Sequence, residues 1–189
     1  MPQLHVFNNT TLDGYFTDPK GDLSWAHMGN DDDPEYQKFV AENAKGGDTL
    51  VLGRKTYEMM ASYWPTPEAS KNQPDVAEGM NKLRKIVFSK TLNELKWNNS
   101  ILVKGDAVEE MRKLKAGDGK HMTILGSGTI ISQLAPAGLI DEYQLLVNPV
   151  VLGDGRTMFD GVAKQLKLKL TGTRAFGNGK VLMTYSSTG

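Results

Sequence analysis

The chain has 189 residues, of which 39% are hydrophobic and 23% are charged, and its 22 Lys and Arg residues balance 22 Asp and Glu residues. This composition is typical of a soluble protein of one domain, here residues 1–189, and a formal net charge of zero disfavours nucleic-acid or membrane-surface partners. The absence of cysteine excludes disulfides, thiolate–zinc sites and cysteine nucleophiles, and the three histidines lack metal-binding spacing. Because the sequence shows neither a secretion signal nor a long apolar run, we expect a cytoplasmic protein without a membrane span.

In chain order, the first half of the sequence predicts a strand at 4–7 that continues towards 14–16, a long loop at 17–33, a helix at 35–44, a strand at 49–52, a helix at 56–62 and a loop or broken helix at 64–79. The second half predicts strands at 85–89 and 100–103, a helix at 107–115, a strand at 122–125 and a helix from 129 to about 134. A long strand at 141–151 and a final strand pair at 166–171 and 181–185 complete the prediction. Asp32 or Asp33 begins the first helix, because Pro34 suits a first helical position. The turn at 177–179 (GNG) joins the last two strands as a hairpin.

This alternation of strands and helices predicts an α/β fold. Its sheet should be mostly parallel, with helices on both faces and an antiparallel edge at the C-terminal end. In such sheets the ligand lies beyond the carboxyl ends of the strands. We therefore expect the functional residues directly after each strand.

Glycines, hydroxyls and cations follow four of the predicted strands. They are Gly53, Arg54, Lys55 and Thr56; Ser89, Lys90 and Thr91; Lys104 and Gly105; and Gly126, Ser127, Gly128 and Thr129. A helix N-terminus offers unpaired N–H groups to an anion, glycine allows close approach, and Arg can bind a phosphate through two N–H groups.

Two phosphate subsites follow from these residues. The turn at 126–129 suits a pyrophosphate, and the cations at 54–55 with Ser89 and Lys90 suit a 2′-phosphate, which favours NADP over NAD. Each motif has a simpler interpretation, however. GSGTII contains only the first two glycines of GxGxxG and could be an ordinary turn, and the cations could be solvated charges, although they oppose the dipole of a helix start.

Several segments also carry a family resemblance. LVLGRKTYE at 50–58 and KIVFSKTL at 85–92 resemble the NADPH-binding segments of dihydrofolate reductases. TLDGYF at 11–16, TILGSGTI at 123–130 and GLIDEYQLLVNPVVLGDGRTMF at 138–159 resemble the C-terminal reductase domain of the bifunctional riboflavin-biosynthesis deaminase/reductase and its stand-alone relatives. The deaminase half of that enzyme needs a cysteine-containing zinc signature, which this chain lacks.

The resemblance implies a three-layer dihydrofolate-reductase-like fold, NADPH as cofactor, a small-molecule substrate and a homodimer. It also implies roles for individual residues. Asp13 becomes a substrate contact or proton relay, although Asp-Gly is also a common turn dipeptide. Glu35 lies where folate-reducing enzymes place a catalytic carboxylate, with Asp32 and Asp33 as competitors. Candidates for the substrate pocket are Asn8, Trp25 and Arg156.

The leading hypothesis is an NADPH-dependent reductase acting on a small heterocyclic or ribosylated pyrimidine-type substrate, as 5-amino-6-(5-phosphoribosylamino)uracil reductase does. A dihydrofolate reductase is one alternative. A nucleotide-binding module or sensor of the same fold without efficient catalysis is another, because the proton donor is uncertain. A purely structural or dimerisation protein, whose glycine turns are only turns, is a third.

Overall fold

A computed structural model of the protein describes residues 1–27, 33–46 and 49–188. Its strands are β1 (Leu4–Thr11), β2 (Tyr15–Thr17), β3 (Thr49–Gly53), β4 (Lys85–Phe88), β5 (Ser100–Val103), β6 (Met122–Leu125), β7 (Glu142–Asn148), β8 (Arg156–Thr157), β9 (Leu168–Ala175) and β10 (Val181–Ser187). Its helices are η1 (Ser24–His27, a 3-10 helix), α1 (Pro34–Lys45), α2 (Arg54–Tyr63), α3 (Pro67–Asn72), α4 (Pro74–Lys82), α5 (Ala107–Ala116) and α6 (Gly128–Leu134).

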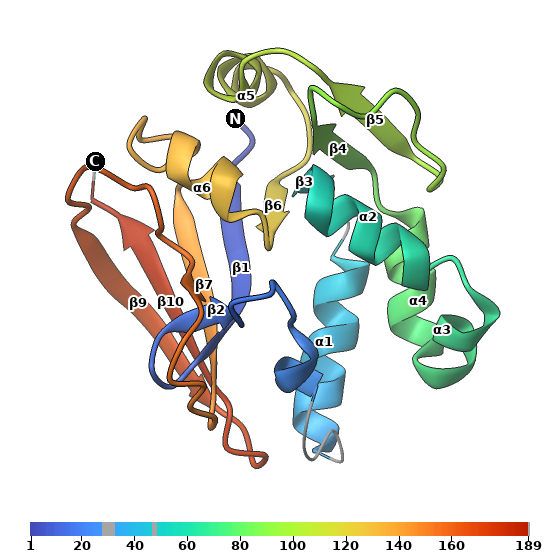
Figure 1. The fold of residues 1–189 in the computed structure, drawn as a ribbon, viewed down its shortest axis with the longest axis vertical. Coiled ribbons are helices and arrows are strands. Elements are labelled where there is room, and N and C mark those ends of the chain that lie inside the picture. The colour runs from blue at the N-terminus through green and yellow to red at the C-terminus, as the bar shows by residue number, and fades with distance from the viewer. Residues whose placement is uncertain (28–32, 47–48, 189) are drawn as a thin grey trace.

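Within the described residues, eight strands form one sheet in the order β5–β4–β3–β6–β1–β7–β10–β9 (Figure 1). The first six of these strands run parallel to one another. β10 is antiparallel to β7, and β9 is antiparallel to β10. This arrangement confirms the predicted α/β fold with a mostly parallel sheet and an antiparallel C-terminal edge.

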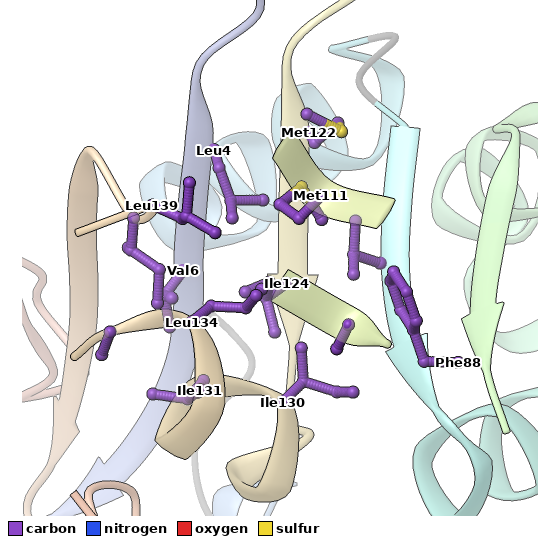
Figure 2. Packing of buried hydrophobic residues seen from close by; sticks show 14 of the residues in the cluster. Leu4, Val6, Phe88, Met111, Met122, Ile124, Ile130, Ile131, Leu134 and Leu139 are labelled. Atoms are coloured by element: carbon purple, nitrogen blue, oxygen red, sulfur yellow. The ribbon is translucent and has the colours of Figure 1, made fainter. Parts of the chain in front are cut away.

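One face of the sheet is covered by α5 and α6. Val6 and Ile124 of the central strands pack with Met111 of α5 and with Ile131 and Leu134 of α6, and all five side chains are buried (Figure 2). These strands are buried and run beside one another at the centre of the sheet. Their carboxyl ends are therefore held in fixed positions.

The opposite face is covered by α1, α2 and α4. Ala44, Tyr57 and Met80, one from each helix, pack with Leu52 of β3, whereas Val51 of the same strand belongs to the core under α5 and α6. The alternation of β3 between two cores explains why its sequence is wholly apolar. Together the two helical layers and the sheet form the predicted three layers. None of the described helices is long and apolar enough to cross a membrane.

Several predicted boundaries differ from the structure; β9, for example, spans Leu168–Ala175 rather than 166–171. α2 begins at Arg54, two residues before the predicted start, and residues 64–79 contain α3 and most of α4, each with proline at its start. Proline ends a preceding helix but suits the first turn of the next. Of the two predicted alternatives for residues 64–79, a loop or a broken helix, the structure has the broken helix. β1 extends to Thr11, and β7 ends at Asn148, before Pro149, which cannot donate a ladder hydrogen bond.

The start of the first helix is settled by Asp33. Its carboxylate accepts hydrogen bonds from the N–H groups of Glu35 and Tyr36, so Asp33 is the N-cap of α1. Asp32, the other predicted start, lies outside the described residues.

Candidate functional site

The predicted phosphate-binding residues lie at one edge of the sheet. β5, β4, β3 and β6 are consecutive neighbours and run parallel, so their carboxyl ends lie at the same edge (Figure 1). In the strand register, Gly53 stands opposite Phe88, and Phe88 stands opposite Val103. The residues that follow these strands are therefore neighbours in space, although long segments separate them in the chain.

Thr56 and Ser127 join two of these strand ends. The N–H of Gly53 donates a hydrogen bond to Ser127 Oγ at 2.8 Å, and the N–H of Ser127 donates to Thr56 Oγ1 at 3.2 Å. Both side chains are buried. Because Thr56 belongs to the first turn of α2 and Ser127 is the N-cap of α6, this contact fixes the N-terminal ends of the two helices against each other.

The turn between β6 and α6 has an unusual backbone. Gly126 and Ser127 have φ values of 57° and 56°, both in the left-handed region. A Cβ atom on Gly126 would lie only 2.8 Å from Thr56 Oγ1, so this position requires glycine for two reasons. A left-handed non-glycine residue such as Ser127 costs about 1–3 kcal/mol and persists only where its surroundings hold it. Gly128 and Thr129 then begin α6, whose N-cap makes no side-chain cap bond.

Asn8 of β1 holds this turn from the other side. The N–H of Gly126 donates to Asn8 Oδ1 at 2.6 Å, and Asn8 Nδ2 donates to the carbonyl of Gly126 at 3.2 Å. Asn8 is 5% exposed, so its amide is engaged by the turn that precedes α6. The structure thus gives Asn8 a positioning contact, and its predicted role in substrate binding stays a prediction.

The N-terminus of α2 carries cations and has no side-chain cap. Gly53 occupies the N-cap position, and the first turn contains no acidic residue. Arg54 Nη1 lies 3.3 Å from Glu58 Oε2, with the two side chains 45% and 46% exposed. Lys55 is exposed and takes part in none of the ion pairs among the described residues. Because cations oppose the dipole at a helix start, a bound anion would relieve this conflict.

The end of β4 adds a hydroxyl and another cation. Ser89 Oγ accepts hydrogen bonds from the N–H groups of Thr91 at 3.2 Å and Leu92 at 3.1 Å. Lys90 is exposed and, like Lys55, takes part in no ion pair among the described residues. Because β3 and β4 are adjacent, this lysine adds positive charge beside the start of α2.

The end of β5 is different. Gly105 precedes Asp106, the N-cap of α5, whose carboxylate accepts hydrogen bonds from the N–H groups of Val108 and Glu109. The start of α5 is therefore capped by the chain itself. Gly105 lies at the predicted edge of the sheet, but beside a helix start that already has a negative charge.

Asp13, predicted to be catalytic, connects two loops. Its carboxylate accepts hydrogen bonds from the Thr11 hydroxyl at 2.6 Å and from the N–H groups of Leu152 at 3.2 Å and Gly153 at 2.8 Å. These bonds, the one from Thr11 foremost, hold the pKa of Asp13 below its usual value. Asp13 is therefore ionised at neutral pH and fastens the β1–β2 turn to the segment after β7, and its catalytic role stays a prediction.

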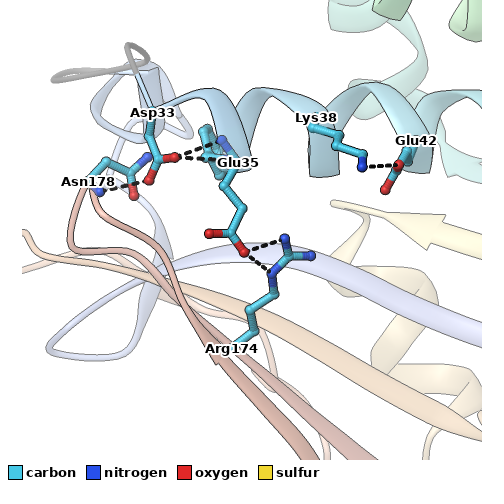
Figure 3. A network of polar contacts seen from close by, with 7 residues as sticks. Asp33, Glu35, Lys38, Glu42, Arg174 and Asn178 are labelled. Carbon is cyan, nitrogen blue, oxygen red and sulfur yellow. Dashed lines mark hydrogen bonds and ion pairs between the residues drawn. The ribbon is translucent and has the colours of Figure 1, made fainter.

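The two carboxylates at the start of α1 bind the β9–β10 hairpin (Figure 3). Glu35 Oε1 accepts hydrogen bonds from Arg174 Nη2 at 2.7 Å and Nε at 3.1 Å. Asp33 accepts one from the N–H of Asn178 at 3.1 Å, and its pKa is held below the usual value, first by the hydrogen bond from Tyr36 N–H. Glu35, the predicted proton donor, is thus paired with a cation, and its role in catalysis also stays a prediction.

The two remaining substrate candidates lie in different surroundings. Trp25, in η1, is 5% exposed, and its indole N–H finds no acceptor among the described residues. A buried donor without an acceptor is uncommon, so this N–H is an unusual feature among the described residues. Arg156, in β8, is exposed and takes part in no ion pair in the described part of the chain. β8 pairs with β2, a two-stranded sheet that the sequence did not predict.

A groove of about 760 Å³ lies away from this edge, at the amino ends of β3 and β4, and its lining includes Lys45, Thr49, Lys82 and Arg84. Its position opposite the carboxyl edge separates it from all the predicted cofactor residues.

Glu58 is the clearest functional candidate missing from the predicted site. Its spacing of four residues from Arg54 is the usual signal for an ion pair on a helix. The sequence predicts a helix start at Thr56, however, and this start leaves Arg54 outside the helix, so the sequence alone does not indicate the pair. Once α2 begins at Arg54, the two side chains lie on one face.

The RibD C-terminal domain model matches residues 2–182, and the chain belongs to this family. "Uncharacterized protein YyaP" of Bacillus subtilis (strain 168) is 32% identical over 179 residues, which cover 95% of this chain and 92% of that protein. The crystal structure of a candidate riboflavin biosynthesis protein from Shewanella sp. PV-4 is similar, with a TM-score of 0.74, 26% identity and 99% of each chain covered.

A dihydrofolate reductase from Enterococcus faecalis, solved with NADP(H), shares the fold at a TM-score of 0.64 and 18% identity, covering 99% of this chain and 97% of that one. The protein therefore has a dihydrofolate-reductase-like fold and is related to the stand-alone forms of the riboflavin reductase domain. Family and fold together place it among reductase-type oxidoreductases.

Proposed function

We propose that the protein is an NADPH-dependent reductase acting on a small heterocyclic or ribosylated pyrimidine-type substrate, such as 5-amino-6-(5-phosphoribosylamino)uracil. The observation that carries this proposal is the uncapped, cationic start of α2 beside the end of β4. Arg54 and Lys55 lie there next to the segment containing Ser89 and Lys90. This set of charges and hydroxyls suits a 2′-phosphate, which distinguishes NADPH from NADH.

The turn between β6 and α6 is suited to the pyrophosphate of the cofactor. The left-handed turn at Gly126 and Ser127 leads into a helix start without a side-chain cap, which suits a pyrophosphate. NADPH, when bound, supplies the hydride. The chain contributes the binding of the phosphates and, through Asn8 and Thr56, the fixed position of the turn.

For the substrate, Trp25 and Arg156 offer complementary chemistry. The buried indole N–H of Trp25 suits an acceptor atom on a heterocycle, and the exposed guanidinium of Arg156 suits a ribose phosphate. Asp13 and Glu35 remain the candidates for proton transfer. In our proposal Glu35 acts only when Arg174 releases it, because two hydrogen bonds from the guanidinium occupy Glu35 Oε1.

The test is calorimetric titration with NADPH and NADH, followed by loss of NADPH absorbance with the aminouracil ribosyl phosphate and dihydrofolate side by side. We expect clear preference for NADPH and oxidation with the aminouracil compound. Failure to bind NADPH, or preference for NADH, contradicts the proposed cofactor. Oxidation with dihydrofolate alone would make the protein a dihydrofolate reductase.

The second candidate is a nucleotide-binding sensor of the same fold. It is favoured by one observation: both predicted catalytic carboxylates, Asp13 and Glu35, are engaged by protein groups. Tight NADPH binding without oxidation by any of these substrates would support it. The resemblance also implies a cytoplasmic homodimer, and light scattering of the purified protein tests whether it is a dimer.

A further inference from the structure

Arg54 shares the first two turns of α2 with a single carboxylate, Glu58. The two side chains form an (i, i+4) pair at 3.3 Å, and each is almost half exposed. Exposed pairs of this kind are weak and are screened by salt. The pair is therefore weak enough for a phosphate to displace Glu58 from Arg54.

The negative charge of Glu58 is opposite in sign to the charges around it. The nearby strand ends supply Arg54, Lys55 and Lys90, and the first turn of α2 contains no acidic residue. A carboxylate one turn further along the helix lowers the positive potential that a phosphate dianion would meet. In Rossmann-fold dinucleotide-binding proteins, a carboxylate near the adenosine ribose accepts a hydrogen bond from the 2′-hydroxyl of NAD, whereas an Arg accommodates the 2′-phosphate of NADP. Arg54 and Glu58 place both groups on one helix face.

We propose that Glu58 is a specificity-determining residue that acts through Arg54. It competes with the 2′-phosphate for the guanidinium and so reduces the preference for phosphorylated over unphosphorylated adenosine ribose. This inference rests on the proposed NADPH function. Removing the charge of Glu58 frees Arg54 for bidentate binding and removes a repulsion, so affinity for a 2′-phosphate should rise about two- to fivefold. Affinity for the same nucleotide without that phosphate should stay constant or fall.

The experiment compares wild type with Glu58→Gln, which keeps the shape of the side chain. Calorimetric titration with adenosine 2′,5′-bisphosphate and with 5′-AMP isolates the 2′-phosphate from the rest of the cofactor. The matched control is Glu78→Gln, because Glu78 pairs with Lys82 at the same (i, i+4) spacing on α4, at the opposite edge of the sheet. Thermal unfolding of each variant checks that the fold is retained.

We expect tighter binding of the bisphosphate by Glu58→Gln, no gain for 5′-AMP, no change in Glu78→Gln, and a smaller difference at high salt. Equal gains for both ligands, or no gain for either, would overturn the role of Glu58 while leaving NADPH binding intact. If wild-type protein fails to prefer the bisphosphate over 5′-AMP, the 2′-phosphate subsite itself is wrong, and the inference fails with it. The two failures are thus distinguished by the behaviour of the wild type.

Discussion

Two helices, α2 and α5, begin at the same edge of the sheet, after the parallel strands β3 and β5, yet their first turns have opposite chemistry. α5 is capped by Asp106 and carries Glu109 and Glu110 in its first turn. α2 begins after Gly53, has no side-chain cap and carries two cations. Because both helix starts expose N–H groups, the position in the fold alone does not make a phosphate site. The difference lies in whether the chain supplies its own negative charge.

The substitution with the largest expected effect is Arg54→Ala, which tests whether the start of α2 binds a phosphate. If the start of α2 binds the 2′-phosphate, removing the guanidinium should weaken NADPH binding about 10- to 100-fold, because charge-assisted hydrogen bonds are lost. NADH lacks that phosphate, so its affinity should change little. Calorimetric titration with both cofactors measures the two effects, and an equal loss for NADPH and NADH would show that Arg54 does not meet the 2′-phosphate.

A second substitution tests the turn that links α2 to α6. Gly126→Ala should lower the free energy of unfolding by roughly 2 kcal/mol, because the alanine would need a left-handed φ and its Cβ would approach Thr56 Oγ1. Gly21→Ala is the matched control, since Gly21 has φ of 87° and open space around its Cβ position. Urea denaturation of both variants separates the conformational cost from the steric cost. Equal destabilisation would mean that Thr56 moves away easily.

The substitution Asp106→Ala tests whether α5 requires the N-cap that Asp106 provides. Loss of the cap should cost about 1 kcal/mol of stability, because two N–H groups lose their acceptor. NADPH affinity should remain within about twofold of wild type. Thermal unfolding and a cofactor titration on the same sample provide both readouts. A large loss of NADPH affinity would place the cofactor at both helix starts and remove the contrast between them.

Much of the fold is predictable from the sequence, because alternating apolar strands and amphipathic helices leave few topologies. The strand ends of β3, β4, β5 and β6 are found by this reasoning, and so is their common edge. The two-residue strand β8 is not predictable, because its pairing with β2 depends on long-range contacts. Boundaries such as the start of α2 also depend on tertiary contacts, here the hydrogen bond from Gly53 to Ser127.

The polar partners of the site residues are harder to predict than their positions. Nothing in the local sequence indicates that Asn8 binds the backbone of Gly126, 118 residues away. The same holds for Glu35 and Arg174, which meet only because the C-terminal hairpin packs beside α1. A residue type and its place after a strand predict a candidate, whereas its contacts require the assembled fold.

The smallest expected effect comes from a comparison of two lysines, Lys55 and Lys104. Lys55 follows β3 and forms no ion pair among the described residues, whereas Lys104 follows β5 and donates a hydrogen bond to Asn93 Oδ1 at 3.2 Å. Lys55→Met should weaken NADPH about threefold at 0.1 M salt, and Lys104→Met should have almost no effect, because an exposed charge acts over only about 10 Å at that salt concentration. Titration at two salt concentrations tests this, and the difference should shrink at the higher one. If both substitutions weaken NADPH equally, the cofactor responds to the general positive charge of the edge, and the start of α2 has no special part in binding it.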